Sequence, residues 1–298
     1  MSKLSAPDAG ASVPTDVSRR GFVALSVAAG VAGAAGSARA AAMDLVETDV
    51  AVTTPDGVCD AAFIRPASGS HPGVVIWPDA FGLRPSMRDM ARRLAAEGYA
   101  VLVPNPFYRV SKAPQYQTAA NFSFTDPADM ARLKPLMASI GAPGAAESDA
   151  PALISFLDAQ PSVDRGRKIG TQGYCMGGAL VLRTAAAVPG RVGAAASFHG
   201  GGLVNDKPDS PHLLAAKIKA RTYFGIASPD DQRQPDAKDA LRTSFAAAKL
   251  PTEIEVYPAK HGWCVPDMPQ DAGAPIYSPP DAERAWGKLL ALYRTGLA

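Results

Sequence analysis

Short apolar runs that alternate with helical patterns are the feature that most constrains the fold of this chain. Residues 73–77, 99–103 and 192–198 contain no charged side chain, and other runs of this kind are separated by stretches whose apolar residues recur at helical spacing. Strands that read as continuous apolar runs are typical of parallel sheets buried on both faces. The pattern predicts an α/β fold with a mostly parallel central sheet and helices on both faces.

The expected elements follow from these runs and from residues that mark helix boundaries, such as Gly98, which ends a helix, and the Asp126-Pro127 pair, which begins one. Before the first of these apolar runs we expect an antiparallel hairpin, with Thr-Pro-Asp-Gly at residues 54–57 as its turn. We expect strands at residues 46–53, 58–66, 73–77, 99–103, 168–173, 192–198, 222–227 and 253–257. We expect helices at residues 86–97, 126–140, 145–160, 176–188, 235–249 and 281–294.

The first 40 residues have a different character from the rest of the chain. Arg19-Arg20 is followed by an uncharged run rich in Ala and Gly at residues 24–37, and then by Ala38-Arg39-Ala40. This pattern resembles a twin-arginine export signal, with cleavage after Ala40 or Ala42. The run is shorter and less apolar than a membrane-spanning helix requires. We therefore expect a protein that uses the export machinery to reach the periplasm or the exterior without stable insertion into the membrane.

The remaining residues, 41–298, are expected to form a single domain. Of the 30 Lys+Arg and 28 Asp+Glu residues, four basic and two acidic ones lie in the first 40 positions, which leaves 26 of each sign. A neutral chain lacks the clustered positive charge that nucleic-acid binding requires, so no nucleic-acid partner is expected. The three cysteines, an odd number, make a poor disulfide framework, and no metal-ligand spacing is present.

The sharpest turn of the pattern lies at Gly-Tyr-Cys-Met-Gly-Gly, residues 173–178, which joins an expected strand to an expected helix. This arrangement is that of a nucleophile elbow with Cys175 in the position of the nucleophile. The glycines allow the strand and helix to cross closely, and the helix N-terminus lowers the pKa of a thiol. The Met176 N–H would then stabilise a developing oxyanion. Two competing interpretations are a cysteine that only packs and a dinucleotide-binding loop, although the glycine spacing does not fit the latter.

A nucleophile elbow predicts an acid and a histidine on loops after later strands. Asp230 and Asp231 follow the expected strand at 222–227, and His261 follows the strand at 253–257. A histidine there can take the thiol proton, and an aspartate can fix its tautomer. Asp230 is preferred because Asp231 lies nearer the start of the next helix, but the sequence leaves both open.

At these motifs the chain resembles the dienelactone hydrolases, a cysteine-nucleophile branch of the α/β-hydrolases. The resemblance extends from about residue 46 to the C-terminus and is carried by residues 173–178, 197–203, 227–231 and 261–267. It implies an α/β-hydrolase fold, a triad of Cys175, Asp230 and His261, and a second oxyanion donor at the N–H of Ala80. It also makes Asp79 a candidate for an acid that pairs with the resting cysteine, although Asp79 is one methylene shorter than the family's glutamate.

The resemblance also implies arginines that hold a substrate carboxylate. Four residues after His261 this chain has Val265, and Arg132 is a candidate for the second arginine. Without a cation at position 265, a buried carboxylate would be poorly solvated, so we expect a preference for neutral substrates. His199 and Trp263 are further candidates for the substrate pocket, and each could equally be a packing residue.

The sequence therefore predicts an exported hydrolase of small-molecule esters or lactones that works through a thioester and needs no metal or organic cofactor. Two alternatives come from other classes of protein. One is a non-catalytic binding protein on the same fold. The other is a thiol redox protein that uses Cys175 with Cys264.

Overall fold

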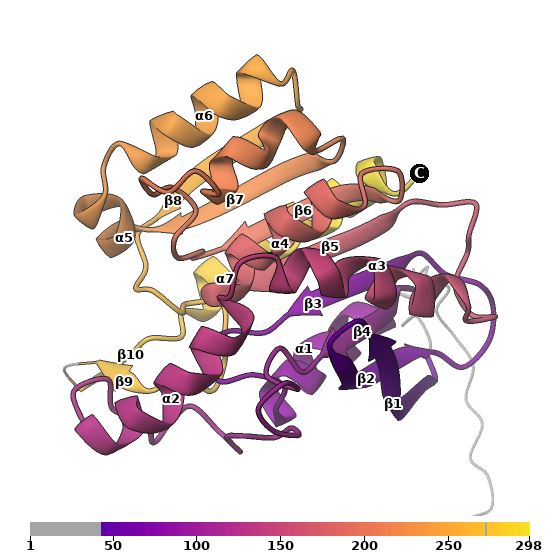
Figure 1. Cartoon of the computed structure of the whole chain (residues 1–298), viewed down its shortest axis with the longest axis horizontal. Helices are drawn as coiled ribbons and strands as arrows, with labels where there is room; N and C mark the ends of the chain where they lie inside the picture. Colours follow the sequence, from indigo (N-terminus) through magenta and orange to yellow (C-terminus); the bar gives the residue numbers. More distant parts are fainter. Residues whose placement is uncertain (1–42, 272) are drawn as a thin grey trace, which may run out of the picture. The chain divides into compact units, whose positions relative to one another are not determined.

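An eight-stranded sheet forms the centre of the computed structural model, which describes residues 43–271 and 273–298 (Figure 1). Its strand order is β1-β2-β4-β3-β5-β6-β7-β8. The first two strands form an antiparallel hairpin, β2 pairs antiparallel with β4, and every pairing from β4 to β8 is parallel. The strands are β1 Leu45–Thr54, β2 Gly57–Pro66, β3 Gly73–Trp77, β4 Ala100–Pro104, β5 Ile169–Tyr174, β6 Val192–Phe198, β7 Arg221–Ala227 and β8 Thr252–Tyr257.

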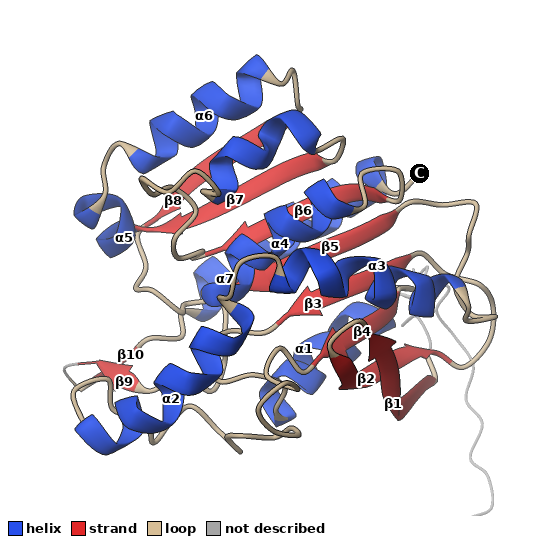
Figure 2. Ribbon diagram, in the orientation of Figure 1, coloured by secondary structure: helices blue, strands red, loops and turns tan. Residues whose placement is uncertain are grey.

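Helices cover both faces of this sheet (Figure 2). The larger helices are α1 Pro85–Ala96, α2 Pro127–Ile140, α3 Ala145–Asp158, α4 Met176–Ala187, α6 Ala237–Ala247 and α7 Pro279–Gly296. Two apolar cores result: one contains side chains of α3, α4 and α6, and the other contains side chains of α1 and α7. The predicted α/β-hydrolase fold, mostly parallel with helices on both faces, is confirmed.

A short helix that was not predicted precedes the helix expected at residues 235–249. The sequence pattern at residues 235–249 begins as α6 only at Ala237, and a separate short helix, α5 Ser228–Arg233, precedes it. Gln234 separates the two with φ −137° and ψ 71°, because a residue before proline is held out of the helical region. The turn of 3-10 helix at Pro211–Lys217 and the small hairpin of β9 Gln270–Asp271 and β10 Ala274–Pro275 were also not predicted, since such short elements carry no periodicity.

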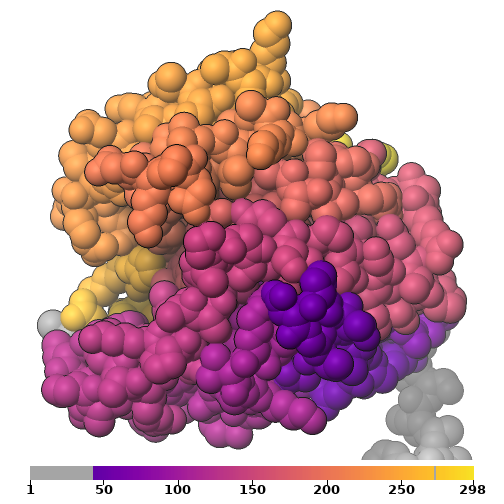
Figure 3. Space-filling view, viewed as in Figure 1, coloured from indigo at the N-terminus to yellow at the C-terminus, as the bar shows by residue number. Residues whose placement is uncertain are grey.

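The segment after β8 carries several residues of the candidate site. In Figure 3 this segment, in dark yellow, is visible between the magenta residues of α2 and the orange residues of α5. The predicted export signal, residues 1–40, lies outside the residues that the structure describes. In the part it does describe, no helix has both the length and the apolar character of a membrane span.

Candidate active site

Cys175 occupies the tight turn between β5, which ends at Tyr174, and α4, which begins at Met176. Its backbone has φ 52° and ψ −116°, a conformation that residues with a Cβ rarely adopt. The neighbouring glycines make this turn possible. A Cβ on Gly177 would lie 2.4 Å from the carbonyl oxygen of Trp77, and one on Gly178 would lie 2.3 Å from Ser197 Oγ. The predicted close crossing of strand and helix is therefore present.

One of the two predicted acids contacts the predicted histidine in the structure. His261 Nδ1 lies 2.6 Å from Asp230 Oδ2. Asp231 instead forms an ion pair with Lys238 at 2.7 Å. Of the two acids that the sequence left open, Asp230 is thus the one that contacts the histidine.

The pKa of His261 is raised from its usual value to about 10. Burial alone would lower this pKa, but hydrogen bonds to Asp230 and to Cys175, together with their charges, outweigh the burial. The imidazole therefore interacts with both other members of the expected triad. At neutral pH this environment favours an imidazolium held between a carboxylate and the sulfur.

Cys175 and His261 line a common pocket of about 370 Å³. Its lining is mainly apolar and comes from four parts of the chain: the loop after β3, the segment before α2, the elbow with the end of β6, and the segments after β7 and β8. The lining residues are Asp79, Ala80, Phe81, Phe124, Cys175, His199, Pro229, Arg233, Lys260, His261, Met268, Asp271 and Ile276. The predicted oxyanion donor residue Ala80 is among them.

Two backbone N–H groups at this pocket are free to donate. Met176 is the first residue of α4, so its N–H has no acceptor within the helix. Among the hydrogen bonds of the described residues, the Ala80 N–H donates to none, whereas the next N–H, that of Phe81, donates to Asp79 Oδ1 at 2.9 Å. The two groups are therefore available to a substrate oxygen.

Asp79 does not have the role that the resemblance suggested. Both of its carboxylate oxygens accept hydrogen bonds from the Arg84 guanidinium, at 2.7 and 2.9 Å. Arg84 also donates to both oxygens of Asp267, at 2.8 and 2.7 Å. The carboxylate is thus engaged by a cation five residues away, and no hydrogen bond joins it to the Cys175 thiol in the described part of the chain.

Of this ion cluster of Asp79, Arg84 and Asp267, Asp79 lines the pocket. The Arg84 side chain is fully buried. Burial opposes its charge, but the two carboxylates raise the pKa of the guanidinium, and Arg84 in turn lowers the pKa of Asp267 against the effect of burial. Arg84 and Asp267 therefore remain charged. Sequence reasoning missed Arg84, because one arginine five residues after an aspartate carries no recognisable signal.

His199 contacts the backbone of Cys175. Its Nδ1 accepts a hydrogen bond of 3.1 Å from the Cys175 N–H, and its ring lies edge to face with that of His261, with centroids 5.0 Å apart. Burial and the proximity of His261 hold its pKa well below the usual value. His199 is therefore neutral and lines the pocket as the sequence suggested.

Two other candidates lie outside the pocket lining. Trp263 is fully buried and stacks on Tyr257 with ring centroids 4.7 Å apart. Arg132 projects from α2 with 63% of its side chain exposed, near Asp129 and over the ring of Tyr116. Both were candidates for the pocket, with a packing tryptophan and a solvated arginine as the alternatives, and the structure shows them packed and exposed respectively.

The reasoning from position 265 also has to be corrected. Val265 is fully buried and does not line the pocket, so the residue at this position does not determine how the pocket treats a carboxylate. Two cations that the sequence analysis did not select, Arg233 and Lys260, do line it. The Arg233 side chain is 74% exposed and only loosely paired with Asp230, at 3.4 Å.

The redox alternative requires Cys175 and Cys264 to pair. All three cysteines are free, and Cys264 lines a different pocket from Cys175. Burial raises the pKa of the Cys59 thiol to about 12 and that of Cys264 well above its usual value. In the described part of the chain, no group of three or more potential ligand side chains is placed to hold a metal ion.

The fold and this site together are those of an α/β-hydrolase with a cysteine at its elbow. Residues 59–297 match the model of the dienelactone hydrolase family, so the chain belongs to that family. It is 31% identical to the carboxymethylenebutenolidase of Rhodococcus opacus over 70% of this chain and 77% of that protein. The carboxymethylenebutenolidase of a Pseudomonas strain is 24% identical, over 77% of this chain and 87% of that one.

Solved structures agree with this assignment. A dienelactone-hydrolase-like promiscuous phosphotriesterase from metagenomic libraries superposes with a TM-score of 0.69 at 25% identity, covering 85% of this chain and 99% of that one. The protein is thus a hydrolase of the ester or lactone type.

The buried ion cluster generates a prediction about stability. Arg84→Met leaves Asp79 and Asp267 without their cation and should lower the free energy of unfolding by about 3–5 kcal/mol. Arg88→Met is the matched control, because Arg88 also binds two carboxylates, of Glu47 and Asp49, but at the surface. It should cost less than about 1 kcal/mol. Urea unfolding of both variants measures the difference, and equal losses would contradict the assignment of the cluster.

Proposed function

We propose that this hydrolase cleaves carboxylic esters or lactones through a triad of Cys175, His261 and Asp230 and a thioester intermediate. The observation that carries the proposal is the 2.6 Å contact of His261 with Asp230 in a pocket that also contains Cys175 at its elbow. A nucleophile, a base and a group that orients the base are the minimum set for covalent acyl transfer.

Acylation begins when His261 takes the proton of the Cys175 thiol, which gives a thiolate and an imidazolium. The sulfur attacks the carbonyl carbon, and the negative charge that develops on the carbonyl oxygen is stabilised by the N–H groups of Met176 and Ala80. When the intermediate collapses, the carbon–oxygen bond to the leaving group breaks. His261 gives its proton to the departing alkoxide or enolate, and the acyl group remains on Cys175 as a thioester.

Deacylation uses the same groups in reverse order. His261 has given its proton to the leaving group, and acylated Cys175 carries no charge and no longer raises the pKa of His261, so the imidazole stays unprotonated and is available as a base. It takes a proton from a water molecule that attacks the thioester carbonyl. The carbon–sulfur bond then breaks, the acid product leaves, and the thiolate and imidazolium are restored.

The triad is tested by substitutions at its three positions. Cys175→Ala should abolish turnover of p-nitrophenyl esters, and His261→Ala should reduce kcat/KM on the order of 10²- to 10⁴-fold. Asp230→Asn should be clearly more damaging than Asp231→Asn, since Asp231 pairs with Lys238 instead of His261. Circular dichroism establishes that each variant is folded. A folded Cys175→Ala protein with unchanged turnover would exclude the mechanism.

The substrate class follows from the shape and charge of the pocket. Its interior is apolar, and Arg84 is already bound by two carboxylates, so a substrate carboxylate finds no free cation there. Arg233 and Lys260 line the pocket with much of their side chains exposed. We therefore infer substrates that are apolar around the bond to be cleaved and whose charge, where they carry one, lies at the mouth near these two cations. Unsaturated lactones with a terminal carboxylate, as the names of the relatives suggest, meet this description.

Matched substrates test the two cations. Arg233→Gln and Lys260→Gln should each raise KM for p-nitrophenyl succinate, which carries a carboxylate, by about twofold to fivefold, the usual effect of an exposed charge pair. KM for the neutral p-nitrophenyl butyrate should stay within twofold. An equal change for both esters would mean that these residues shape the site and do not recognise charge.

We also propose that the protein is exported through its twin-arginine signal. The support is in the sequence alone: Arg19 and Arg20, the uncharged run and the Ala38-Arg39-Ala40 site. Replacing both arginines by lysine should leave the full-length precursor inside the cell, as cell fractionation and immunoblotting would detect. Export at the original level by that variant would contradict the proposal.

A further inference from the structure

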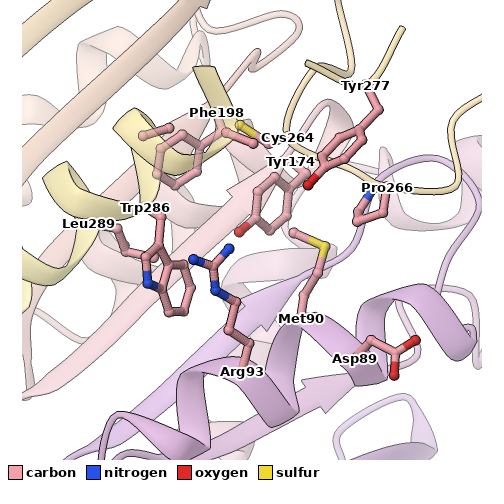
Figure 4. Close-up of a pocket in the computed structure, with 12 residues that line it drawn as sticks. Asp89, Met90, Arg93, Tyr174, Phe198, Cys264, Pro266, Tyr277, Trp286 and Leu289 are labelled. Atoms are coloured by element: carbon pink, nitrogen blue, oxygen red, sulfur yellow. The ribbon is translucent and has the colours of Figure 1, made fainter. Parts of the chain in front are cut away.

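A second pocket, of about 250 Å³, lies between α1 and α7 on the face of the sheet opposite α4. Four aromatic side chains contribute to its lining: Tyr174 and Phe198 from the ends of β5 and β6, Trp286 from α7, and Tyr277 from the segment before α7 (Figure 4). Nothing in the hydrolytic mechanism uses this space.

The pocket is open because small residues of α7 face it. Ala282 and Ala285 lie in its lining, where longer side chains would fill the space between the helix and the sheet. Across from them, Tyr174 and Phe198 stack with centroids 5.5 Å apart and an interplanar angle of 18°. A flat apolar surface is thus exposed to the cavity, and a planar molecule could lie on it.

The charged side chains that line this pocket already have partners of opposite charge. The Arg93 guanidinium lies 4.2 Å from the centroid of the Trp286 ring and donates to both oxygens of Glu283, at 2.8 and 2.6 Å. Asp89 accepts from Arg92 at 2.7 Å. In Figure 4 the guanidinium lies beside the Trp286 ring and forms part of the wall. The pocket therefore offers no unpaired charge, which favours an uncharged occupant.

One polar group in the pocket has unused hydrogen-bonding capacity. The Tyr174 hydroxyl accepts a hydrogen bond of 2.7 Å from Gln172 Nε2, but its own O–H donates to no group among the described residues. The side chain is fully buried, and burial raises its pKa, so the hydroxyl stays protonated. A buried donor without an acceptor is unfavourable unless a bound molecule supplies the acceptor.

We propose that this pocket is a second ligand site, which binds an uncharged aromatic molecule of one or two rings with one oxygen acceptor directed at the Tyr174 hydroxyl. The size is consistent, because an apolar protein cavity of ~150 Å³ holds a benzene molecule. The site is distinct from the catalytic pocket: Tyr174 precedes Cys175 in the chain, yet the two residues line different pockets. The proposal does not depend on the proposed function.

Acetophenone, a single ring with one carbonyl oxygen, is a suitable probe. Isothermal titration calorimetry on the whole protein should give one binding event with a Kd on the order of 0.1–1 mM, typical of a well-seated fragment. Benzoate has nearly the same size but carries a charge, so it should bind at least about tenfold more weakly. If acetophenone does not bind at a concentration about 10-fold above the upper expected Kd of ~1 mM, or if benzoate binds equally well, the proposal is wrong.

Two variants locate the bound probe. Ala282→Leu fills the cavity from α7 and should weaken acetophenone binding more than about tenfold. Tyr174→Phe removes only the hydroxyl and should weaken binding by about threefold to tenfold, the effect of one hydrogen bond. The second variant keeps the test decisive if the first fails to fold, which circular dichroism would show.

Phe124→Ala is the matched control, because it removes an aromatic side chain from the catalytic pocket and leaves the second pocket unchanged. Its affinity for acetophenone should equal that of the unmodified protein. Weaker binding by Phe124→Ala, together with unchanged binding by Tyr174→Phe, would place the probe in the catalytic pocket and refute the second site.

Discussion

The close approach of α4 to the ends of β3 and β6 is the constraint on which the site depends. Gly177 lies against the carbonyl oxygens of Trp77 and Pro78, and Gly178 lies against Ser197 and Gly200, with no room for a Cβ at either position. The contact of Gly177 with Trp77 and Pro78 also fixes the elbow relative to the loop that follows β3. Because Met176 precedes Gly177 and Ala80 follows Pro78, one packing contact sets the distance between the two expected oxyanion donors.

The buried ion cluster adds a second constraint across the pocket. Arg84 joins Asp79, on the loop after β3, to Asp267, on the segment after β8. These segments are far apart in sequence, and the segment with Asp267 also carries His261. In a low-dielectric interior the cluster is stable only when all three charges are present. The position of the histidine is therefore tied to the same loop that carries Ala80.

The sequence was sufficient for features that rest on local pattern. The strand at Val192–Phe198 and the helix start at Met176 were predicted at their observed positions, because apolar runs and the glycine-rich turn specify them locally. The short helix α5 was missed, because six residues are too few to show helical periodicity.

The site was predicted less completely for a physical reason. Cys175, Asp230 and His261 each follow a strand, so chain order and topology bring them together. Arg84, Arg233 and Lys260 are ordinary charged residues whose neighbours are determined only by tertiary packing. For the same reason Trp263 and Val265, which lie close to His261 in the sequence, and Arg132, which lies near no motif, do not line the pocket.

The two sides of the catalytic pocket are stabilised by different interactions, and this difference determines which residues can be replaced without loss of stability. One side rests on the ion cluster, where changing any member leaves a buried charge. The other includes Phe124, which is 52% exposed and packs against the aromatic rings of Phe81 and Phe122. Substitutions at Phe124 change the shape of the pocket mouth without leaving a buried charge unpaired. Substitutions on the aromatic side should therefore change substrate preference at a smaller cost in stability than substitutions in the ion cluster.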